Sequence, residues 1–318
     1  MHTLGSTGLR VSPLGLGLAA LGRPGYINLG HGADVGDSGV EAMERHAHAV
    51  LDAAYEGGVR YYDAARSYGR AEAFLASWLE RRGLGRDDVT VGSKWGYEYT
   101  AGWRVDAEEH EVKDLSVETL RRQLGETRQL LGDRLALYQI HSATLESGVL
   151  DDSAVRDELA RLRAAGIFVG FTATGARQAQ TIERALEVGS FDAVQATWNL
   201  HERSAGPALA AAHEAGLGVI VKEALANGRL TERGAGGDSP LLAAARERGT
   251  TPDALALAGA LAQPWADVVL SGAATVETLR SNLAALDVTW DADLEARLAG
   301  LAERPDDYWE RRAALPWN

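Results

Sequence analysis

Eight short apolar runs alternate with longer amphipathic segments along this chain, and that alternation restricts the possible folds more than any other feature. The apolar runs span residues 14–18, 59–63, 89–94, 135–141, 167–172, 193–197, 218–222 and 268–271. The helical patterns span residues 41–56, 70–82, 117–131, 154–165, 176–187, 208–215, 253–262 and 276–286. Strands that alternate with helices form parallel sheets, and eight such units predict an α/β protein with a (β/α)8 TIM barrel.

The same pattern argues against two dinucleotide-binding halves. Gly15-Leu16-Gly17-Leu18-Ala19-Ala20 keeps only the first two glycines of a phosphate-binding loop, and no helix opens directly behind it. We interpret it as a barrel strand that packs closely on its neighbours. No low-complexity linker divides the chain, so residues 1–318 are predicted to form one barrel domain.

The sequence also predicts a hairpin before the barrel and long insertions between its strands and helices. Residues 4–11 form a β-hairpin pattern that turns at Thr7-Gly8, and we expect this hairpin to plug one end of the barrel. Long insertions follow strands on the side where barrel active sites are built. These insertions cover residues 21–40, 95–114 and 223–239, and the tail beyond Asp293 adds further aromatic residues. Aromatic loops above a polar floor favour a substrate pocket, although each ring could simply pack its own loop.

Composition excludes several classes of function. The 32 basic and 45 acidic residues give a formal charge of −13, which argues against a nucleic-acid-binding surface but leaves room for a local phosphate pocket. The absence of cysteine excludes disulfides, thiolate metal sites and a cysteine nucleophile, and we expect no metal site. The N-terminal residues do not resemble a secretory signal, and no apolar stretch approaches a membrane span. A cytoplasmic protein without a membrane partner is the expectation.

Four polar residues lie at or just after the ends of neighbouring predicted strands. Asp63, Lys94 and His141 end the second, third and fourth apolar runs, and Tyr68 follows Asp63 closely. Reduction of a carbonyl needs a hydride at carbon and a proton at oxygen, and a tyrosine phenol can supply that proton if a nearby cation favours the phenolate. Lys94 is the candidate cation, Asp63 its counter-ion, and His141 a hydrogen-bonding group for the carbonyl oxygen.

Each of these residues also has a structural interpretation. Asp63 alone could cap a turn, Lys94 alone could be a solvated strand end, and His141 could be a core histidine with satisfied hydrogen bonds. Their occurrence together on successive strands favours the catalytic interpretation.

The motif Asp63-x4-Tyr68-Gly69, the pair Lys94-Trp95 and the run ending in His141 resemble the catalytic tetrad of the aldo-keto reductases. The resemblance extends over nearly the whole chain, and all four tetrad positions are filled. It implies a (β/α)8 barrel that binds NADP(H), less often NAD(H), in an extended form. It also implies that Tyr68 is the general acid or base, that Lys94 and Asp63 tune it, and that His141 orients the substrate.

The cofactor side of the resemblance is less complete. The resemblance places the nicotinamide end against Gly17 and Leu18, Thr172 and Gln195, whereas Ala173 stands where the family has an amide side chain. Lys222 replaces a tyrosine that stacks on the nicotinamide. Its alkyl stem could cover one ring face, or Lys222 and Glu223 could be a solvated pair at the barrel mouth.

The phosphate and adenosine end is expected near the last strand. Besides the four residues at the nicotinamide end, the resemblance assigns eight more to cofactor binding: Lys222, Glu223, Leu225, Ser271, Gly272, Ala273, Arg280 and Asn282. The arginine that many members use for a 2′-phosphate aligns with Thr278, and Arg280 could substitute or point to solvent. The expectation of NADP(H) rather than NAD(H) therefore comes from the family.

The leading hypothesis is an enzyme that transfers a hydride between NADP(H) and a small aldehyde, ketone or sugar. The expected substrate pocket comprises Tyr26, Trp95, Tyr97, Trp198 and Trp309. One alternative is a regulatory subunit on the same barrel that senses a nicotinamide nucleotide without physiological turnover, motivated by Ala173 and Lys222. Another is a lyase that uses Lys94 as a Schiff-base amine, which Asp63 disfavours by keeping the lysine charged.

Overall fold

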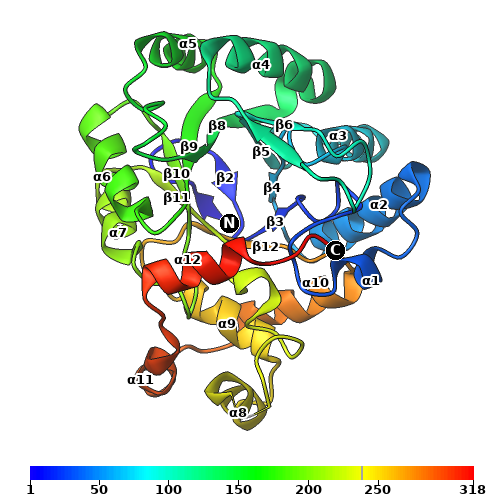
Figure 1. Ribbon diagram of the computed structural model, residues 1–318, viewed down its shortest axis with the longest axis vertical. Helices are drawn as coiled ribbons and strands as arrows, with labels where there is room; N and C mark the ends of the chain where they lie inside the picture. Colours follow the sequence, from blue (N-terminus) through cyan, green and yellow to red (C-terminus); the bar gives the residue numbers. More distant parts are fainter. Residues whose placement is uncertain (238) are drawn as a thin grey trace.

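The computed structural model describes residues 1–237 and 239–318, and these form a closed parallel barrel surrounded by helices (Figure 1). The eight barrel strands are β3 (Leu14–Gly17), β4 (Tyr61–Asp63), β5 (Thr90–Trp95), β8 (Leu135–Ala143), β9 (Phe168–Ala173), β10 (Ala193–Thr197), β11 (Gly218–Lys222) and β12 (Val268–Ser271). They pair in chain order, and β12 closes the barrel by pairing with β3. The prediction of a (β/α)8 barrel is confirmed.

The helices that cover the barrel lie close to the predicted segments. They are α2 (Val40–Glu56), α3 (Ala71–Arg82), α4 (Val117–Leu131), α5 (Ser153–Ala164), α6 (Gln178–Val188), α7 (Gly206–Glu214), α9 (Pro252–Leu261) and α10 (Val276–Leu283). Side chains cap several N-termini; the Ser116 hydroxyl, for example, accepts a hydrogen bond from the amide of Thr119 at 3.3 Å. Among the described residues, none of the helices combines the length and apolar character that crossing a membrane requires.

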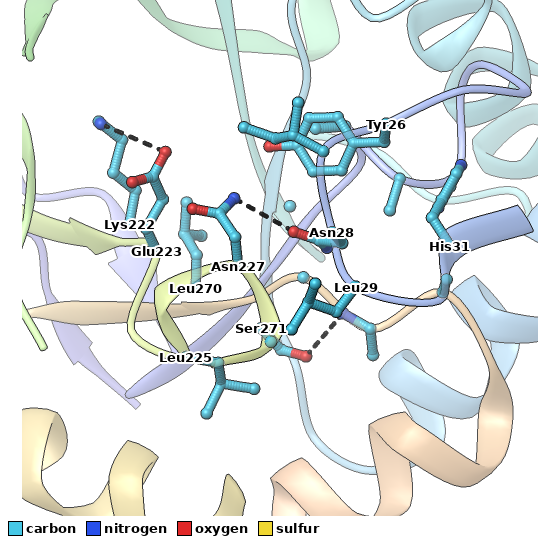
Figure 2. Close-up of a pocket in the computed structure, with 18 of the residues that line it drawn as sticks. Tyr26, Asn28, Leu29, His31, Lys222, Glu223, Leu225, Asn227, Leu270 and Ser271 are labelled. Atoms are coloured by element: carbon cyan, nitrogen blue, oxygen red, sulfur yellow. Dashed lines mark hydrogen bonds and ion pairs between the residues drawn. The ribbon is translucent and has the colours of Figure 1, made fainter. Parts of the chain in front are cut away.

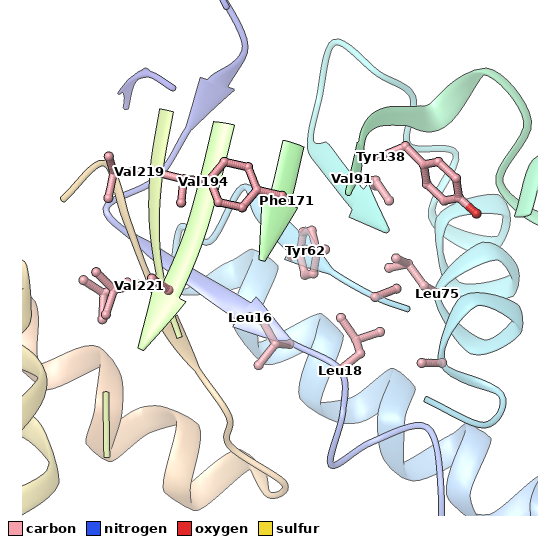
Figure 3. Packing of buried hydrophobic residues seen from close by; sticks show 14 of the residues in the cluster. Leu16, Leu18, Tyr62, Leu75, Val91, Tyr138, Phe171, Val194, Val219 and Val221 are labelled. Atoms are coloured by element: carbon pink, nitrogen blue, oxygen red, sulfur yellow. The ribbon is translucent and has the colours of Figure 1, made fainter. Parts of the chain in front are cut away.

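Alternation along each strand separates two environments. Leu16, Tyr62, Val91, Tyr138 and Phe171 point outward and pack against the surrounding helices (Figure 3). Because successive strand residues face opposite sides, their direct neighbours point into the barrel. The outward set is mainly apolar and forms the main core, although Ser93 also faces outward and donates to Glu72 of α3 at 2.5 Å. Inward-facing polar residues such as Asp63, Lys94 and Gln195 gather near the carboxyl ends.

The N-terminal hairpin closes the opposite end of the barrel. Strand β1 (His2–Thr3) pairs antiparallel with β2 (Arg10–Val11), and Leu4 lies fully buried between them. Leu4 and Val11 pack against inward-facing residues of the barrel, including Ile220. The predicted plug is confirmed.

Further elements lie between the barrel units and after them, and the sequence patterns did not predict most of them. These elements are α1 (His31–Val35), β6 (Tyr97–Tyr99), β7 (Glu111–Lys113), α8 (Pro240–Glu247), α11 (Ala292–Leu298), α12 (Pro305–Ala313) and the short 3-10 turns η1 (Gly132–Arg134), η2 (Ala226–Gly228), η3 (Ala284–Asp287) and η4 (Ala299–Leu301). Helix α12 lies across the barrel opening (Figure 1), where Arg312 contacts Glu223 after β11. The tail therefore forms part of the roof of the barrel.

Candidate active site

Asp63 and Lys94 form an enclosed ion pair at the carboxyl ends of β4 and β5. Both side chains point into the barrel, and the Lys94 Nζ lies 2.5 Å from Asp63 Oδ2, with neither side chain more than 2% exposed. Lys94 also donates to the carbonyl of Ala64 at 3.0 Å. The other oxygen of Asp63 accepts hydrogen bonds from Gln195 at 3.0 Å and Gln139 at 3.4 Å. These amides fix the carboxylate, and the carboxylate fixes the ammonium.

Tyr68 reaches this ion pair from the loop after β4. Its hydroxyl accepts a hydrogen bond from Lys94 Nζ at 3.3 Å. The chain turns sharply behind it at Gly69, where φ is +59° and a Cβ would lie 2.4 Å from the carbonyl oxygen of Gly22. Only glycine fits this backbone position, and the turn holds the tyrosine over the barrel.

The direction of the Tyr68 pKa shift differs from the expectation. Burial of the phenol and the negative charge of Asp63 raise the pKa of Tyr68 well above its ordinary value, and the positive charge of Arg23 opposes this shift. The expected net lowering of this pKa is not observed, because burial and the charge of Asp63 outweigh the effect of the cations. Lys94 still donates to the phenol oxygen and can stabilise a phenolate. Tyr68 is consequently protonated at neutral pH and can act as a proton donor.

His141 completes the predicted group of four. Its ring meets the Tyr68 ring edge-on with centroids 5.5 Å apart, and the Tyr97 ring with centroids 5.0 Å apart. Burial and the nearby charge of Lys94 lower the pKa of His141 well below its ordinary value. The imidazole is therefore neutral at physiological pH, and its enclosed Nδ1 has no hydrogen-bond partner among the described residues.

A cavity of about 790 Å³ opens above these residues and extends to the loop between β12 and α10. Of the residues predicted for the site, it is lined by Asp63, Tyr68, His141, Gly17, Gln195, Lys222, Glu223, Leu225, Ser271, Gly272, Ala273, Asn282, Tyr26 and Tyr97. Figure 2 shows Tyr26, Asn28 and Leu29 of the first insertion on the opposite side from Lys222 and Glu223. Lys94 lies beneath this surface. The cavity volume falls within the range of about 300–1,000 Å³ that is usual for ligand pockets.

Three residues predicted for the site lie elsewhere because of strand alternation. Trp95 directly follows Lys94 and faces outward, where it is fully buried in the helix-facing core. Trp198 likewise points away from the barrel interior and lines a separate shallow groove beside Trp265. The Leu18 side chain also packs in the core on the outer face of the barrel.

The remaining three are near the site without lining the cavity. The hydroxyl of Thr172 is occupied by the amide of Ser142 at 2.7 Å. Trp309 lies behind Lys222, with the ammonium 5.6 Å from its ring centre. Arg280 is exposed on α10 and does not line the cavity. It follows Glu277, which does line the cavity, by three residues along α10.

Lys222 and Glu223 form part of a buried network with the C-terminal helix. The Lys222 ammonium donates to the Thr197 hydroxyl at 2.8 Å and lies 4.0 Å from the Glu223 carboxylate. Both oxygens of that carboxylate accept hydrogen bonds from the Arg312 guanidinium. Burial lowers the pKa of Lys222 to about 8, although the charge of Glu223 opposes this. The interpretation as a solvated pair is wrong, because Glu223 is only 9% exposed.

Arg23 is a site residue that the sequence patterns did not indicate. Its side chain is 3% exposed, donates to the carbonyl of Ser67 at 3.0 Å, and forms an ion pair with Glu111 on β7. It lines the cavity among the rings of Tyr26, Tyr68 and Trp317. Arg23 reaches this position only because two insertions and the tail fold against one another, and no local sequence motif predicts that arrangement.

The far part of the cavity is lined by hydrogen-bonding groups. Ser271 donates to the Asn282 side chain at 2.7 Å, and Asn282 in turn donates to Asp253 at 2.7 Å. Thr275 caps the N-terminus of α10 next to the backbone of Gly272 and Ala273. An elongated cavity that joins a proton donor to a helix N-terminus fits an extended dinucleotide.

This chain belongs to the aldo/keto reductase family, whose model matches residues 13–303. It is 26% identical to the uncharacterized oxidoreductase YrpG of Bacillus subtilis over 92% of each chain. It is also 27% identical to a D-threo-aldose 1-dehydrogenase of a Pseudomonas species, over 64% of this chain and 67% of that protein. The fold is shared with the aldo-keto reductase AKR11C1 of Bacillus halodurans at a TM-score of 0.72 and 21% identity, covering 95% and 96% of the two chains. The protein is therefore an oxidoreductase of this family.

Proposed function

We propose that this enzyme transfers a hydride between a nicotinamide dinucleotide and a small aldehyde, ketone or sugar, and that Tyr68 exchanges the proton. The observation that carries the proposal is the contact of Tyr68 with the enclosed Asp63–Lys94 pair on the floor of the cavity. The family resemblance favours NADP(H) as the nucleotide.

The proposed chemistry divides between the nucleotide and the protein. A bound nicotinamide would supply the hydride for carbonyl reduction, or accept it in alcohol oxidation. Tyr68 donates its proton to the carbonyl oxygen as that oxygen becomes an alkoxide. The resulting phenolate is stabilised by Lys94 at 3.3 Å and by the charge of Arg23.

His141 and the cavity wall would position the substrate. The neutral imidazole can donate a hydrogen bond to the carbonyl oxygen, and this leaves the proton transfer to Tyr68. Gly17, Gln195 and Lys222 would hold the nicotinamide end of the nucleotide, and Ser271, Ala273 and Asn282 the other end. These assignments rest on their positions along the cavity.

Aromatic rings and charged pairs above Tyr68 favour a polyhydroxylated substrate. Tyr26, Tyr97 and Trp317 offer ring faces, while Arg23 and Glu111 offer donors and acceptors within the same wall. Sugars combine apolar faces with hydroxyl groups and match such walls. The D-threo-aldose 1-dehydrogenase relative supports an aldose as the first substrate to assay.

The test is the Tyr68→Phe variant, assayed with NADH and NADPH across a panel of aldehydes, ketones and aldoses. Turnover should fall by about 10²–10⁴-fold, while nucleotide binding measured by fluorescence should persist. Tyr55→Phe, on the outer helix α2, is the matched control and should retain activity. Full activity in Tyr68→Phe would contradict the mechanism. Nucleotide binding without turnover by the wild-type enzyme would instead favour the sensing subunit.

A further inference from the structure

The end of the cavity farthest from Tyr68 determines which adenosine-containing nucleotide it can accept. Hydride transfer places the nicotinamide near Tyr68, so an extended dinucleotide directs its adenosine half toward the other end. That end is lined by the residues after β12 and by the first turns of α9 and α10: Thr251, Pro252, Asp253, Ser271, Gly272, Ala273, Ala274, Thr275, Glu277, Thr278, Ser281 and Asn282. NAD and NADP differ there by a single phosphate on the adenosine ribose.

This end of the cavity presents carboxylates. Glu277 lies in the first turn of α10, is exposed, and has no hydrogen-bond or ion-pair partner among the described residues. Asp253 uses one oxygen to accept from Asn282, which leaves its other oxygen at the cavity wall. Carboxylates accept hydrogen bonds from ribose hydroxyls and repel a phosphate dianion.

Every lysine and arginine in the described lining of the cavity is already paired with a carboxylate. Arg23 pairs with Glu111, Lys222 and Arg312 pair with Glu223, and Arg233 pairs with Asp34 through two contacts of 2.6 and 2.8 Å. The exposed Arg280 lies outside the lining. A 2′-phosphate would therefore have to break an existing ion pair, or recruit Arg280 from outside the lining three residues after Glu277, to obtain a counter-ion.

The helix N-terminus at this end does not make up for the missing cation. The amide of Thr278, one of the first-turn donors, donates to the Thr275 hydroxyl at 3.0 Å. Donors of the first turn are thus partly occupied within the protein. The position that would carry a cationic side chain is instead the neutral Thr278.

We propose that this cavity selects NAD(H) over NADP(H), and that Glu277 is the specificity-determining residue. The proposal rests on the proposed nicotinamide-dependent function and replaces the NADP(H) preference that the family resemblance implies. Glu277 accepts a hydrogen bond from a ribose hydroxyl of NAD(H) and excludes the additional phosphate of NADP(H) by like-charge repulsion.

Equilibrium binding without any carbonyl substrate tests this proposal. Titration of the wild-type enzyme with NADH and with NADPH, followed by quenching of tryptophan fluorescence, should show NADH binding at least about tenfold more tightly. Glu277→Gln should reduce that ratio, and Glu277→Gln combined with Thr278→Arg should reverse it. Thermal melting with each nucleotide should rank the variants in the same order.

A matched control removes the same charge elsewhere. Glu183→Gln, on the exposed face of α6 and outside the cavity lining, should leave both dissociation constants unchanged. Tighter binding of NADPH by the wild-type enzyme, or a ratio unchanged by Glu277→Gln, would overturn the proposal. Loss of NADPH binding in Arg280→Gln would also overturn it, because Arg280 would then be the counter-ion. Failure of both nucleotides to bind would overturn the proposed function as well, so the two failures are distinguishable.

Discussion

The guanidinium carbon of Arg23 lies 5.3 Å from the centre of the Tyr68 ring. Arg23 comes from the first insertion and is held by Glu111 from the second insertion, so two loops together place a cation beside the proposed proton donor. The charge of Arg23 lowers the pKa of Tyr68 against burial and Asp63, whereas the charge of Glu111 raises it. The loops above the barrel thereby tune the acid–base group, and Lys94 is not the only cation that does so.

This tuning predicts opposite effects from two substitutions. Arg23→Gln, made together with Glu111→Gln to avoid an unpaired buried charge, should raise the Tyr68 pKa and slow alcohol oxidation about tenfold at neutral pH. Glu111→Gln alone should lower the Tyr68 pKa and move the alkaline limb of the pH profile in the other direction. Measurement of kcat/KM for oxidation against pH decides between them, and shifts of the same sign in both variants would contradict the assignment.

Variants of the Asp63–Lys94 pair should distinguish its contribution to stability from its contribution to catalysis. Asp63→Asn or Lys94→Met leaves one member of a fully enclosed pair uncompensated, and each should lower the free energy of unfolding by about 3–5 kcal/mol. Asp63→Leu combined with Lys94→Met should regain much of that stability in urea denaturation and remain inactive. Activity in the double variant would show that the pair is structural only.

Acid should weaken the attachment of α12. Burial disfavours the Glu223 carboxylate, but the charge of Arg312 outweighs it and lowers the pKa of Glu223 from 4.5 to about 2. A folded-state pKa below the unfolded one means that this contribution is complete above about pH 4.5 and is lost as the pH falls toward 2. It is on the order of 3 kcal/mol at neutral pH.

The corresponding measurement is the free energy of unfolding in urea as a function of pH, for the wild type and Glu223→Gln. The gap between the two proteins should be largest at neutral pH and should shrink as the pH decreases below about 4.5. A gap that stays constant over this range would contradict the assigned ion pair.

The neutral state of His141 predicts a flat pH profile where histidines usually titrate. Because the pKa of His141 lies well below 6.5, carbonyl reduction should show no ionisation from this residue between about pH 6 and 8. His141→Gln, which also carries a neutral donor, should raise KM more than it lowers kcat and should leave the profile unchanged. An acid limb near pH 6.5 that disappears in this variant would indicate a protonated imidazole instead.

The positions of the strands could be predicted from the sequence, because each strand corresponds to a short local run of apolar residues. Apolar runs such as residues 193–197 and 268–271 coincide with β10 and β12. The alternation of side chains along a strand explains why Trp95 was wrongly predicted to line the pocket. Lys94 points into the barrel, so the next residue, Trp95, must face the helices. The helix positions were predicted more accurately, because each amphipathic pattern extends over more residues than a strand pattern does.

The upper wall of the cavity could not be predicted in this way. Arg23 meets Glu111 only when two insertions fold over each other, and Arg312 meets Glu223 only when the tail crosses the barrel. Such ion pairs form only when the loops adopt one conformation and bury both charges together. Neither condition produces a repeating pattern in the sequence. The tetrad positions, in contrast, are tied to strand ends.

The pairing of β12 with β3 has a consequence for how the enzyme is made. Leu14 pairs with Val269, so the first and last barrel strands are neighbours despite lying near opposite ends of the chain. A nascent chain that has emerged only through β11 already contains Tyr68, Lys94 and His141, yet it lacks the wall formed by Ser271 to Asn282. Contacts between such distant segments form slowly. Binding of a dinucleotide should therefore begin only after β12 and α10 have been synthesised, and a bound nucleotide should stabilise the closed barrel.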